Sequence, residues 1–409
     1  MHNFLSYIIL TIVVLSYLLG LLSDYLNIKA LNPNLPDEMS DTYNAEKYKK
    51  TQLYTKEKTQ FGFINQTLMF ILTIFMLLFD GFALLNTIVC KWFENTIWQA
   101  LAFFGIIASI VSIIELPFDY YFTFVIEEKF GFNKSTKKTF WLDKIKGLLL
   151  SILIGGGIGY LLLWIIISMP NTFVLWTFIV IASFSIFFAM FYTSLIVPLF
   201  NKLTPLPQGQ LRTAIEQFSQ KTGFKIKNIY SIDGSKRSTK ANAYFSGLGP
   251  QKTIVLFDTL IELLNPTEVV AVLAHEIGHN KKQHIVKSLI LSLLSTAAML
   301  FILQIIFKYQ IFSQALGVEQ TKIHISVIVF GILLEPISTF INIFTNTLSR
   351  KFEYQADNYA KSHNLAQELI SSLKKLSVNN LTNLTPHKLN VLLHYSHPPL
   401  IERIKNLKS

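Results

Sequence analysis

Seven long apolar stretches alternate with polar segments along this chain. Each is about as long as the roughly 20 residues that an α-helix needs to cross a bilayer. They occupy approximately residues 4–24, 64–89, 97–117, 147–168, 173–197, 286–308 and 324–347. A hydrophilic segment, 200–285, separates the fifth stretch from the sixth, and a polar tail, 348–409, follows the seventh. The pattern predicts a mainly α-helical, polytopic membrane protein. Its first stretch is expected to be a retained span, because no Lys or Arg precedes it and no signal-cleavage site follows.

The composition fits a membrane protein and excludes an ordinary soluble enzyme. Of the 409 residues, 51% are apolar and only 15% are charged, and 34 are phenylalanines. The net charge of +11 could indicate a nucleic-acid partner, but no nucleic-acid motif accompanies it, so we expect none. The single cysteine, Cys90, excludes an intrachain disulfide and a Cys-rich metal site.

Lysines gather in alternate loops between the predicted spans. The loops after the first and third spans carry Lys29, Lys47, Lys49, Lys50, Lys56, Lys58, Lys129, Lys134, Lys137, Lys138, Lys144 and Lys146. The segment 200–285 and the tail are also rich in Lys and Arg, whereas the other side has only Lys91, Lys308 and Lys322. By the positive-inside rule, the N-terminus lies outside, and both the segment 200–285 and the C-terminus lie in the cytoplasm.

Several polar or helix-breaking residues fall within the predicted spans. Asp80 lies in the second span, Glu115 at the end of the third, and Glu335 beside Pro336 in the seventh. Carboxylates at membrane depth usually face a bundle interior or a watery cavity, so we expect cavity lining or structural pairing. Pro336 predicts a kink. The glycines at 155–157 predict close packing of the fourth helix against a neighbour.

The hydrophilic segment is typical of a small α+β domain. In order we expect a linker at 198–209, a helix at 209–221, a strand at 227–232, a turn at Asp233 and Gly234, and strands at 243–245 and 253–257 joined by a turn at 247–250. Many zinc peptidases place a small sheet before a metal-binding helix. An edge strand of such a sheet can hold an extended substrate by main-chain hydrogen bonds.

An H-E-x-x-H pattern lies near the end of this segment. His275 and His279 stand four residues apart on a predicted helix, so they share one face and can bind one metal ion. Glu276 lies beside the first histidine, where a general base would act on an activated water. The pattern is typical of zinc-assisted hydrolysis of a peptide bond. The site is expected at the cytoplasmic face, near the start of the sixth span.

A catalytic zinc usually takes three protein ligands, so one more is needed. Glu353 is a candidate, with Asp357 one helical turn later, placed to hold a ligand histidine by its free ring N–H. The alternative is a solvated acidic face paired with Arg350, and the spacing alone does not decide between the two. His284 is a weaker competitor, because a continued helix would place it off the face that carries His275.

Further motifs resemble those of one known family. In chain order they are Leu116-Pro117-Phe118, Thr123-Phe124-Val125-Ile126-Glu127-Glu128, Gly131-Phe132-Asn133, Pro198-Leu199-Phe200, Thr204-Pro205-Leu206-Pro207, Gly234-Ser235-Lys236-Arg237-Ser238, Asn242-Ala243-Tyr244-Phe245, Ile254-Val255-Leu256-Phe257-Asp258-Thr259-Leu260, the stretch 349–357, and His394-Tyr395-Ser396-His397-Pro398-Pro399. Together with the H-E-x-x-H helix they resemble the type 1 CAAX prenyl proteases, which are integral-membrane zinc metallopeptidases of the gluzincin type.

The resemblance implies a fold and a site. Family members have seven helices around a large water-filled chamber, with one zinc ion at its cytoplasmic side. The resemblance implies Glu353 as the third zinc ligand, with Asp357 behind the ligands, His397 stabilising the oxyanion and Arg403 supporting the site. It also implies that the strand Asn242, Ala243, Tyr244 and Phe245 lines the substrate groove. The family releases the last three residues of C-terminal C-a-a-X sequences whose cysteine carries an isoprenyl group.

Two departures bear on where the protein works. The insertion that some family members carry before the metal helix is absent, because residues 261–266 lead almost directly into it. The C-terminus also lacks a dilysine or other retrieval signal. Both features fit a compact, bacterial version in the plasma membrane. If the host is a eukaryote, the expected membrane is that of the endoplasmic reticulum.

Three hypotheses about function remain open at this stage. The first is an endopeptidase that acts on isoprenylated C-termini. The second is a broader membrane quality-control protease, and the third is a non-catalytic membrane binding protein or transporter. Under the first two, the expected parts are residues 1–199 with five spans, 200–285 with the substrate strand and the metal helix, 286–347 with two spans, and 348–409 with the third ligand and the His-Pro-Pro motif.

Overall fold

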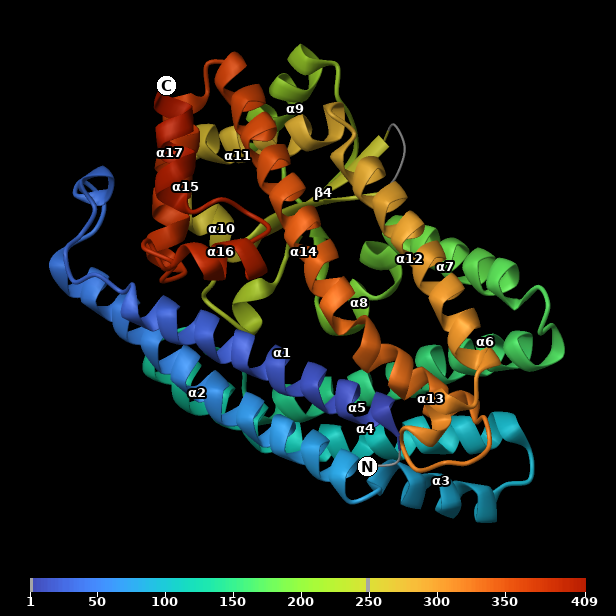
Figure 1. The fold of residues 1–409 in the computed structure, drawn as a ribbon. Helices are drawn as coiled ribbons and strands as arrows, with labels where there is room; N and C mark the ends of the chain where they lie inside the picture. Colours follow the sequence, from blue (N-terminus) through green and yellow to red (C-terminus); the bar gives the residue numbers. More distant parts are fainter. Residues whose placement is uncertain (1–2, 248–250) are drawn as a thin grey trace.

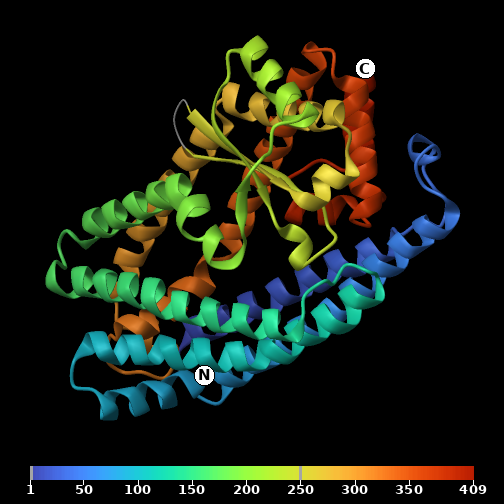
Figure 2. The ribbon, with the colours of Figure 1, turned by 180° about the vertical axis from the view of Figure 1, so that it is seen from behind.

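A computed structural model describes residues 3–247 and 251–409 (Figures 1 and 2). Up to residue 200 the chain forms α1 (Phe4–Lys29), η1 (Asp37–Met39), α2 (Ala45–Leu78), α3 (Gly81–Trp92), α4 (Thr96–Tyr121), η2 (Phe122–Glu127), α5 (Lys137–Leu150), η3 (Ser151–Gly156), α6 (Gly157–Ser168), α7 (Phe173–Leu195) and α8 (Val197–Phe200). From residue 203 onwards it forms β1 (Leu203–Pro205), α9 (Gln210–Thr222), β2 (Lys225–Ile232), η4 (Gly234–Lys236), β3 (Ala243–Ser246), β4 (Gln251–Phe257), α10 (Asp258–Leu263), α11 (Pro266–Lys281), α12 (His284–Lys308), α13 (Ile311–Gln314), α14 (Ile323–Ser362), α15 (Ala366–Asn379), α16 (Lys388–His394) and α17 (Leu400–Lys408). Of the predicted turn at 247–250, residues 248–250 lie outside the described residues.

Seven helical segments in the described chain are long and apolar enough to cross a membrane, which confirms the predicted number. They are Phe4–Lys29, Ala45–Leu78, Thr96–Glu127, Lys137–Ser168, Phe173–Phe200, His284–Lys308 and Ile323–Ser362. At most 22% of the residues in their apolar windows are buried within the chain. Such sparse packing leaves apolar side chains for lipid and is expected of helices that surround a space. Figures 1 and 2 show α1, α2, α4 and α5 below the sheet, whereas α12 and α14 extend from that level up past it.

The predicted second span at 64–89 is wrong at both ends. Helix α2 already begins at Ala45, and it ends at Leu78. Asp80 then adopts a left-handed backbone, with φ of 53°, before α3 begins. Gly81 suits this position because a Cβ there would lie 2.5 Å from the sulfur of Met76. Asp80 therefore lies at a sharp turn, which a hydropathy pattern does not register because both flanking helices are apolar.

The other residues singled out within the spans have mixed outcomes. Glu115 accepts a hydrogen bond of 3.0 Å from Asn65 of α2, which confirms structural pairing there. The close packing predicted for glycines 155–157 is wrong, because a Cβ on any of them would meet no described atom within 4 Å. Gly155 and Gly156 instead end a π-helical segment, η3. Helix α14 runs unbroken through Pro336, and the side chain of Glu335 is exposed on the same helix.

The peptidase side of the molecule is built on a four-stranded sheet in the order β1-β2-β4-β3. Strands β3 and β4 pair antiparallel, as the sequence predicts, and the predicted helix at 209–221 is α9. Strand β2 lies parallel to β4, a pairing that needs the intervening chain as a crossover. Strand β4 is central and buried, which leaves β3 as an edge strand.

The largest hydrophobic core joins this sheet to helices far apart in the sequence. It contains Ile254 and Leu256 of β4 together with buried residues of α9, α11, α15 and α17. The loop after the first span also enters it, because Met39, Tyr43 and Tyr48 are at most 4% exposed and pack there. This loop is therefore part of the peptidase core, although its lysines indicate only a polar connection.

Candidate metal centre

Helix α11 carries both histidines and has a well-defined start. Asn265 accepts a hydrogen bond from the backbone N–H of Glu268, and the Glu268 carboxylate accepts one from the backbone N–H of Asn265, each 2.9 Å long. Pro266 is the first helical residue, where its missing N–H costs nothing. The Glu268 carboxylate also contacts Lys375 and Ser371 of α15. Burial raises the pKa of Glu268, but these partners outweigh burial and lower it.

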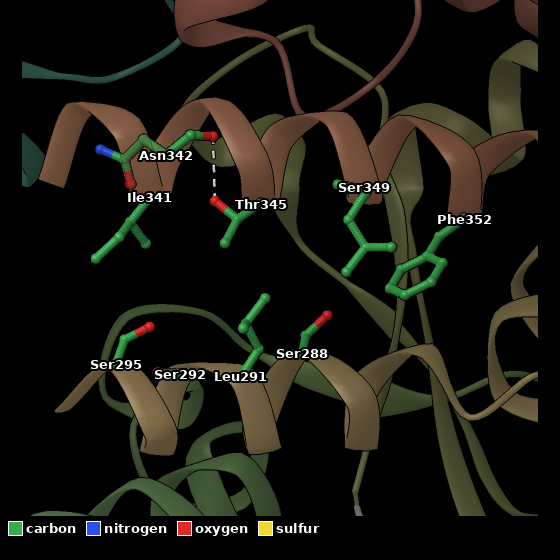
Figure 3. Close-up of a pocket in the computed structure, with 10 residues that line it drawn as sticks. Ser288, Leu291, Ser292, Ser295, Ile341, Asn342, Thr345, Ser349 and Phe352 are labelled. Carbon is green, nitrogen blue, oxygen red and sulfur yellow. Dashed lines mark hydrogen bonds between the residues drawn. The ribbon is translucent and has the colours of Figure 1, made fainter. Parts of the chain in front are cut away.

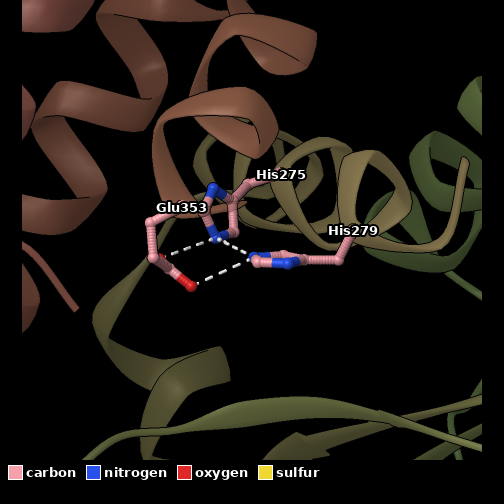
Figure 4. A group of neighbouring side chains, drawn as sticks. All are labelled: His275, His279 and Glu353. Carbon is pink, nitrogen blue, oxygen red and sulfur yellow. Dashed lines mark hydrogen bonds and ion pairs between the residues drawn. The ribbon is translucent and has the colours of Figure 1, made fainter. Parts of the chain in front are cut away.

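Three side chains from two helices converge at the predicted metal site (Figure 4). The Nε2 atoms of His275 and His279 lie 3.1 Å apart. The Glu353 carboxylate of α14 lies 3.1 Å from His279 Nε2 and 3.4 Å from His275 Nε2. One ligand atom from each residue lies within 4.8 Å of the others. The structure thus brings the near and distant halves of the predicted ligand set together.

Asp357 and Arg403 lie behind His275, away from His279. Asp357 Oδ1 is 2.8 Å from His275 Nδ1, and Arg403 donates two hydrogen bonds of 2.9 and 2.6 Å to the same carboxylate. Because the carboxylate accepts the proton on Nδ1, the Nε2 atom of His275 presents its lone pair to the site. Burial and Arg403 lower the pKa of His275, but the carboxylates of Asp357 and Glu353 outweigh them and raise it to about 9. A metal ion that binds Nε2 must therefore displace the proton that the carboxylates favour there.

The arrangement suits a cation. Glu353 and Asp357 are 3% and 0% exposed, so the solvated acidic face considered as an alternative is wrong. Glu353 Oε2 makes no hydrogen bond in the described part of the chain, and it lies 3.4 Å from both Arg403 Nη1 and His275 Nε2. Two imidazole lone pairs and one buried carboxylate thus point at a shared position. Such a cluster of acceptors is costly to bury unless a positive ion binds between them.

Two further predicted residues, Glu276 and His397, lie at this site. Glu276 is partly buried and follows His275 directly on α11. His397 Nε2 lies 3.4 Å from Glu353 Oε1, and 64% of the His397 side chain is exposed. Ser396 Oγ contacts the opposite ring nitrogen, Nδ1, at 3.0 Å, so Nε2 is the nitrogen that faces the metal ligands.

Arg350 anchors the segment that carries His397 and does not pair with the acidic residues. Its guanidinium donates hydrogen bonds to the carbonyls of Val391 and Tyr395, at 3.1 and 2.7 Å. These carbonyls lie at the C-terminal end of α16, where the helix dipole favours a cation. Sequence reasoning missed this role because α16 is short and weakly patterned.

The predicted substrate strand is the edge strand β3. The backbone carbonyl of Asn242, just before it, accepts a hydrogen bond from Phe257, and Ala243 pairs with Leu256. Phe245 packs edge-on against Phe224 of the core, with ring centroids 5.5 Å apart. Tyr244 packs against a smaller cluster around Val197 and Val255. The side chains anchor the strand, and among the described residues no strand pairs with its outer main-chain edge.

His284 contacts the site but does not join the ligand set. Sequence reasoning placed it on a continued helix, yet α11 ends at Lys281 and Gln283 turns the chain with φ of 58°. His284 then begins α12, where its Nδ1 lies 3.0 Å from His279 Nδ1 and its Nε2 lies 2.8 Å from Gln355 Oε1. The sequence does not point to Gln355, because a single glutamine on a helix belongs to no recognisable motif.

A cavity of about 250 Å³, lined by both polar and apolar side chains, lies between α12 and α14 (Figure 3). Hydroxyl and amide groups from both helices face it; they are Ser288, Ser292, Ser295, Asn342, Thr345 and Ser349. Phe352 closes one end and stacks on His284, with ring centroids 4.1 Å apart. The cavity thus lies between two membrane-crossing helices and ends at Phe352, the residue before Glu353.

Comparison with known proteins decides the family. The profile described as "CAAX prenyl protease N-terminal, five membrane helices" matches residues 24–202, and that of "Peptidase family M48" matches residues 205–409. The chain belongs to peptidase family M48. It is therefore an integral, multi-pass membrane metalloprotease, and the non-catalytic hypothesis is not supported.

Relatives in this family match nearly the whole chain. CAAX prenyl protease 1 of Saccharomyces cerevisiae is 35% identical over 93% of this chain and 89% of its own length. The CAAX prenyl protease 1 homologs of Oryza sativa subsp. japonica and Homo sapiens are 34% and 32% identical, over 98% and 92% of this chain and 96% and 89% of their own lengths. The crystal structure of S. mikatae Ste24p superposes with a TM-score of 0.94 at 33% identity and covers 99% of both chains.

Proposed function

We propose that this metalloprotease is a zinc endopeptidase that cleaves CAAX-type, isoprenylated C-termini and releases the last three residues. The observation that carries the proposal is the convergence of two histidine lone pairs and the Glu353 carboxylate, in a chain whose whole-length relatives are named CAAX prenyl protease 1. The substrate is a peptide or protein C-terminus presented at the membrane.

Zinc is the metal that best suits the site. His275, His279 and Glu353 would hold it, since two imidazoles and one carboxylate are a usual catalytic zinc set that leaves a position open. Zinc supplies Lewis acidity there, which makes a water nucleophilic near neutral pH and polarises the scissile carbonyl.

The other residues at the site would have separate roles in the reaction. Glu276 takes the proton of the attacking water and delivers it to the leaving amine. His397 donates from Nε2 to the developing oxyanion, because that nitrogen faces the ligands. Asp357 and Arg403 hold His275 in the tautomer that offers Nε2 to the metal.

The edge of β3 would bind the substrate. An extended peptide can add to this edge by main-chain hydrogen bonds, with Asn242, Ala243, Tyr244 and Phe245 lining the groove. The distribution of lysines supports a site at the cytoplasmic side of the membrane. It also supports the four-part division proposed from the sequence, with the metal ligands split between residues 200–285 and 348–409.

Mass spectrometry of cleavage products tests the proposal. Matched farnesylated and unfarnesylated CAAX peptides are incubated with the wild type and with Glu276→Gln. We expect loss of the terminal tripeptide from the farnesylated peptide, little cutting of the other, and no cutting by a variant that retains its zinc. Equal cutting of both peptides would instead favour the broader quality-control protease. Turnover by zinc-loaded Glu276→Gln would remove Glu276 as the base.

A further inference from the structure

We propose that His284, held by Gln355, is a positioning residue that sets the tautomer of His279 for metal binding. The inference rests on the proposed metal site and adds a second set of supporting residues to it. His275 is oriented by a carboxylate, whereas His279 would be oriented by a neutral imidazole. His284 is itself only 3% exposed, so its ring nitrogens must be satisfied by protein partners.

The hydrogen bonds that join Gln355, His284 and His279 determine which ring nitrogen of each histidine carries its proton. Gln355 Oε1 can only accept, so His284 Nε2, at 2.8 Å, carries the proton between them. In a neutral imidazole the other nitrogen is then an acceptor. His284 Nδ1 therefore accepts from His279 Nδ1, at 3.0 Å. His279 Nε2 is left without a proton and faces His275 Nε2 and Glu353, where a metal would bind.

Helices α12 and α14 hold the hydrogen-bonded relay of Gln355, His284 and His279 in place. The turn at Gln283, with φ of 58°, redirects the chain after α11 and brings His284 back toward the ligands. The Phe352 ring stacks on His284 with an interplanar angle of 9°. Phe352 and Gln355 flank the ligand Glu353 on α14. The helix that delivers the third ligand thus also fixes the orientation of the second.

Metal affinity of the full-length protein in detergent tests the relay directly. The zinc dissociation constant is measured by competition with a chromophoric chelator. His284→Phe removes the acceptor but keeps a ring on Phe352, and we expect zinc binding about 10- to 100-fold weaker. His284→Asn places an amide oxygen near the position of Nδ1 and should restore most of the affinity. His363→Phe, at the residue that follows the last residue of α14, is the matched control and should bind zinc as the wild type does.

Two variants of Gln355 test its role without changing a histidine. Gln355→Met removes the acceptor at similar volume and should weaken zinc binding several-fold, whereas Gln355→Glu keeps the acceptor and should bind at least as tightly as the wild type. This pair decides the question even where His284→Phe fails to fold, which thermal unfolding of the metal-free protein reveals. Wild-type affinity in both folded His284→Phe and Gln355→Met would overturn the relay. Since the readout is zinc binding, a wild type that binds zinc but leaves prenylated peptides intact would refute the proposed substrate and not the relay.

Discussion

Gly278 of α11 lies directly against Ala356 of α14, with no room for a side chain between them. A Cβ on Gly278 would come within 3.0 Å of Ala356 Cα and 2.9 Å of Tyr359 Cβ. This contact lies between the two ligand-bearing stretches, because Gly278 is next to His279 and Ala356 is next to Asp357. The glycine therefore allows the helix approach that places Glu353 between the histidines.

Replacing Gly278 by alanine should separate α11 from α14. The inserted methyl meets backbone, which cannot rotate away, so we expect about 1–3 kcal/mol of destabilisation and weakened metal binding. Thermal unfolding and zinc content of the purified protein measure the two effects. Gly155→Ala is the matched control, since a Cβ there meets nothing within 4 Å. Equal stability and zinc content in both variants would contradict this role for Gly278.

Loss of Arg350 should impair catalysis while leaving the metal in place. In Arg350→Met the carbonyls of Val391 and Tyr395 lose the guanidinium that joins them to α14, so the segment carrying His397 shifts. We expect cleavage to fall by up to about 100-fold, because small displacements of a catalytic group are costly. Zinc affinity should stay at the wild-type value, since Arg350 makes no contact with a ligand in the described chain. Lys351→Met, one residue along and exposed, should have full activity.

Removal of the metal should abolish cleavage reversibly. A chelator is expected to inactivate the wild type, and added zinc should restore both activity and thermal stability. Ligand binding to the native state alone stabilises by about 2.7 kcal/mol at a free concentration of 100 times Kd. His275→Ala should gain neither, because one of the three ligands is missing. Cleavage that survives exhaustive chelation would exclude a metal-dependent mechanism.

The start of α11 should respond to pH through Glu268. Its pKa is lowered from the ordinary value of 4.5, because the hydrogen bonds from Lys375, Ser371 and the cap outweigh burial. A depressed pKa means that the folded state favours the carboxylate, so the stabilisation is present above the unfolded pKa. It is lost as the pH falls through the lower pKa of the folded protein.

Glu268→Gln isolates that contribution, since glutamine can still form the capping box but not the ion pair with Lys375. The melting temperature of the variant should lie below that of the wild type near neutral pH. The gap should close as the pH falls below the ordinary value of 4.5 and through the lowered pKa of the folded wild type, where the carboxylate takes up its proton. Glu262→Gln, on α10 and outside the box, serves as the comparison. A gap that stays constant with pH would mean that the charge of Glu268 contributes nothing.

Local pattern accounts for much of the fold. The seven spans follow from hydropathy alone, since burying a span in lipid depends on its composition and not on its neighbours. The strand pair β3–β4 and helix α9 follow from short-range alternation and periodicity. Two predictions are wrong. The second span ends early because the chain turns at Asp80, and glycines 155–157 do not pack closely because no neighbouring atom lies near them. Neither turn geometry nor packing partners can be read from a run of apolar residues.

By itself, the sequence determined that this is a membrane protein and that His275 and His279 share one face of a helix. Both are consequences of composition and of spacing within one helical turn. Only the tertiary structure decided which acidic residues complete the site, because Asp357 contacts His275 across 82 positions of chain. It also placed His284 against His279 and Gln355, apart from the cluster of His275, His279 and Glu353. That outcome depends on a turn at Gln283 and on Gln355 from a distant helix, and contacts between distant segments leave no periodic signal in the chain.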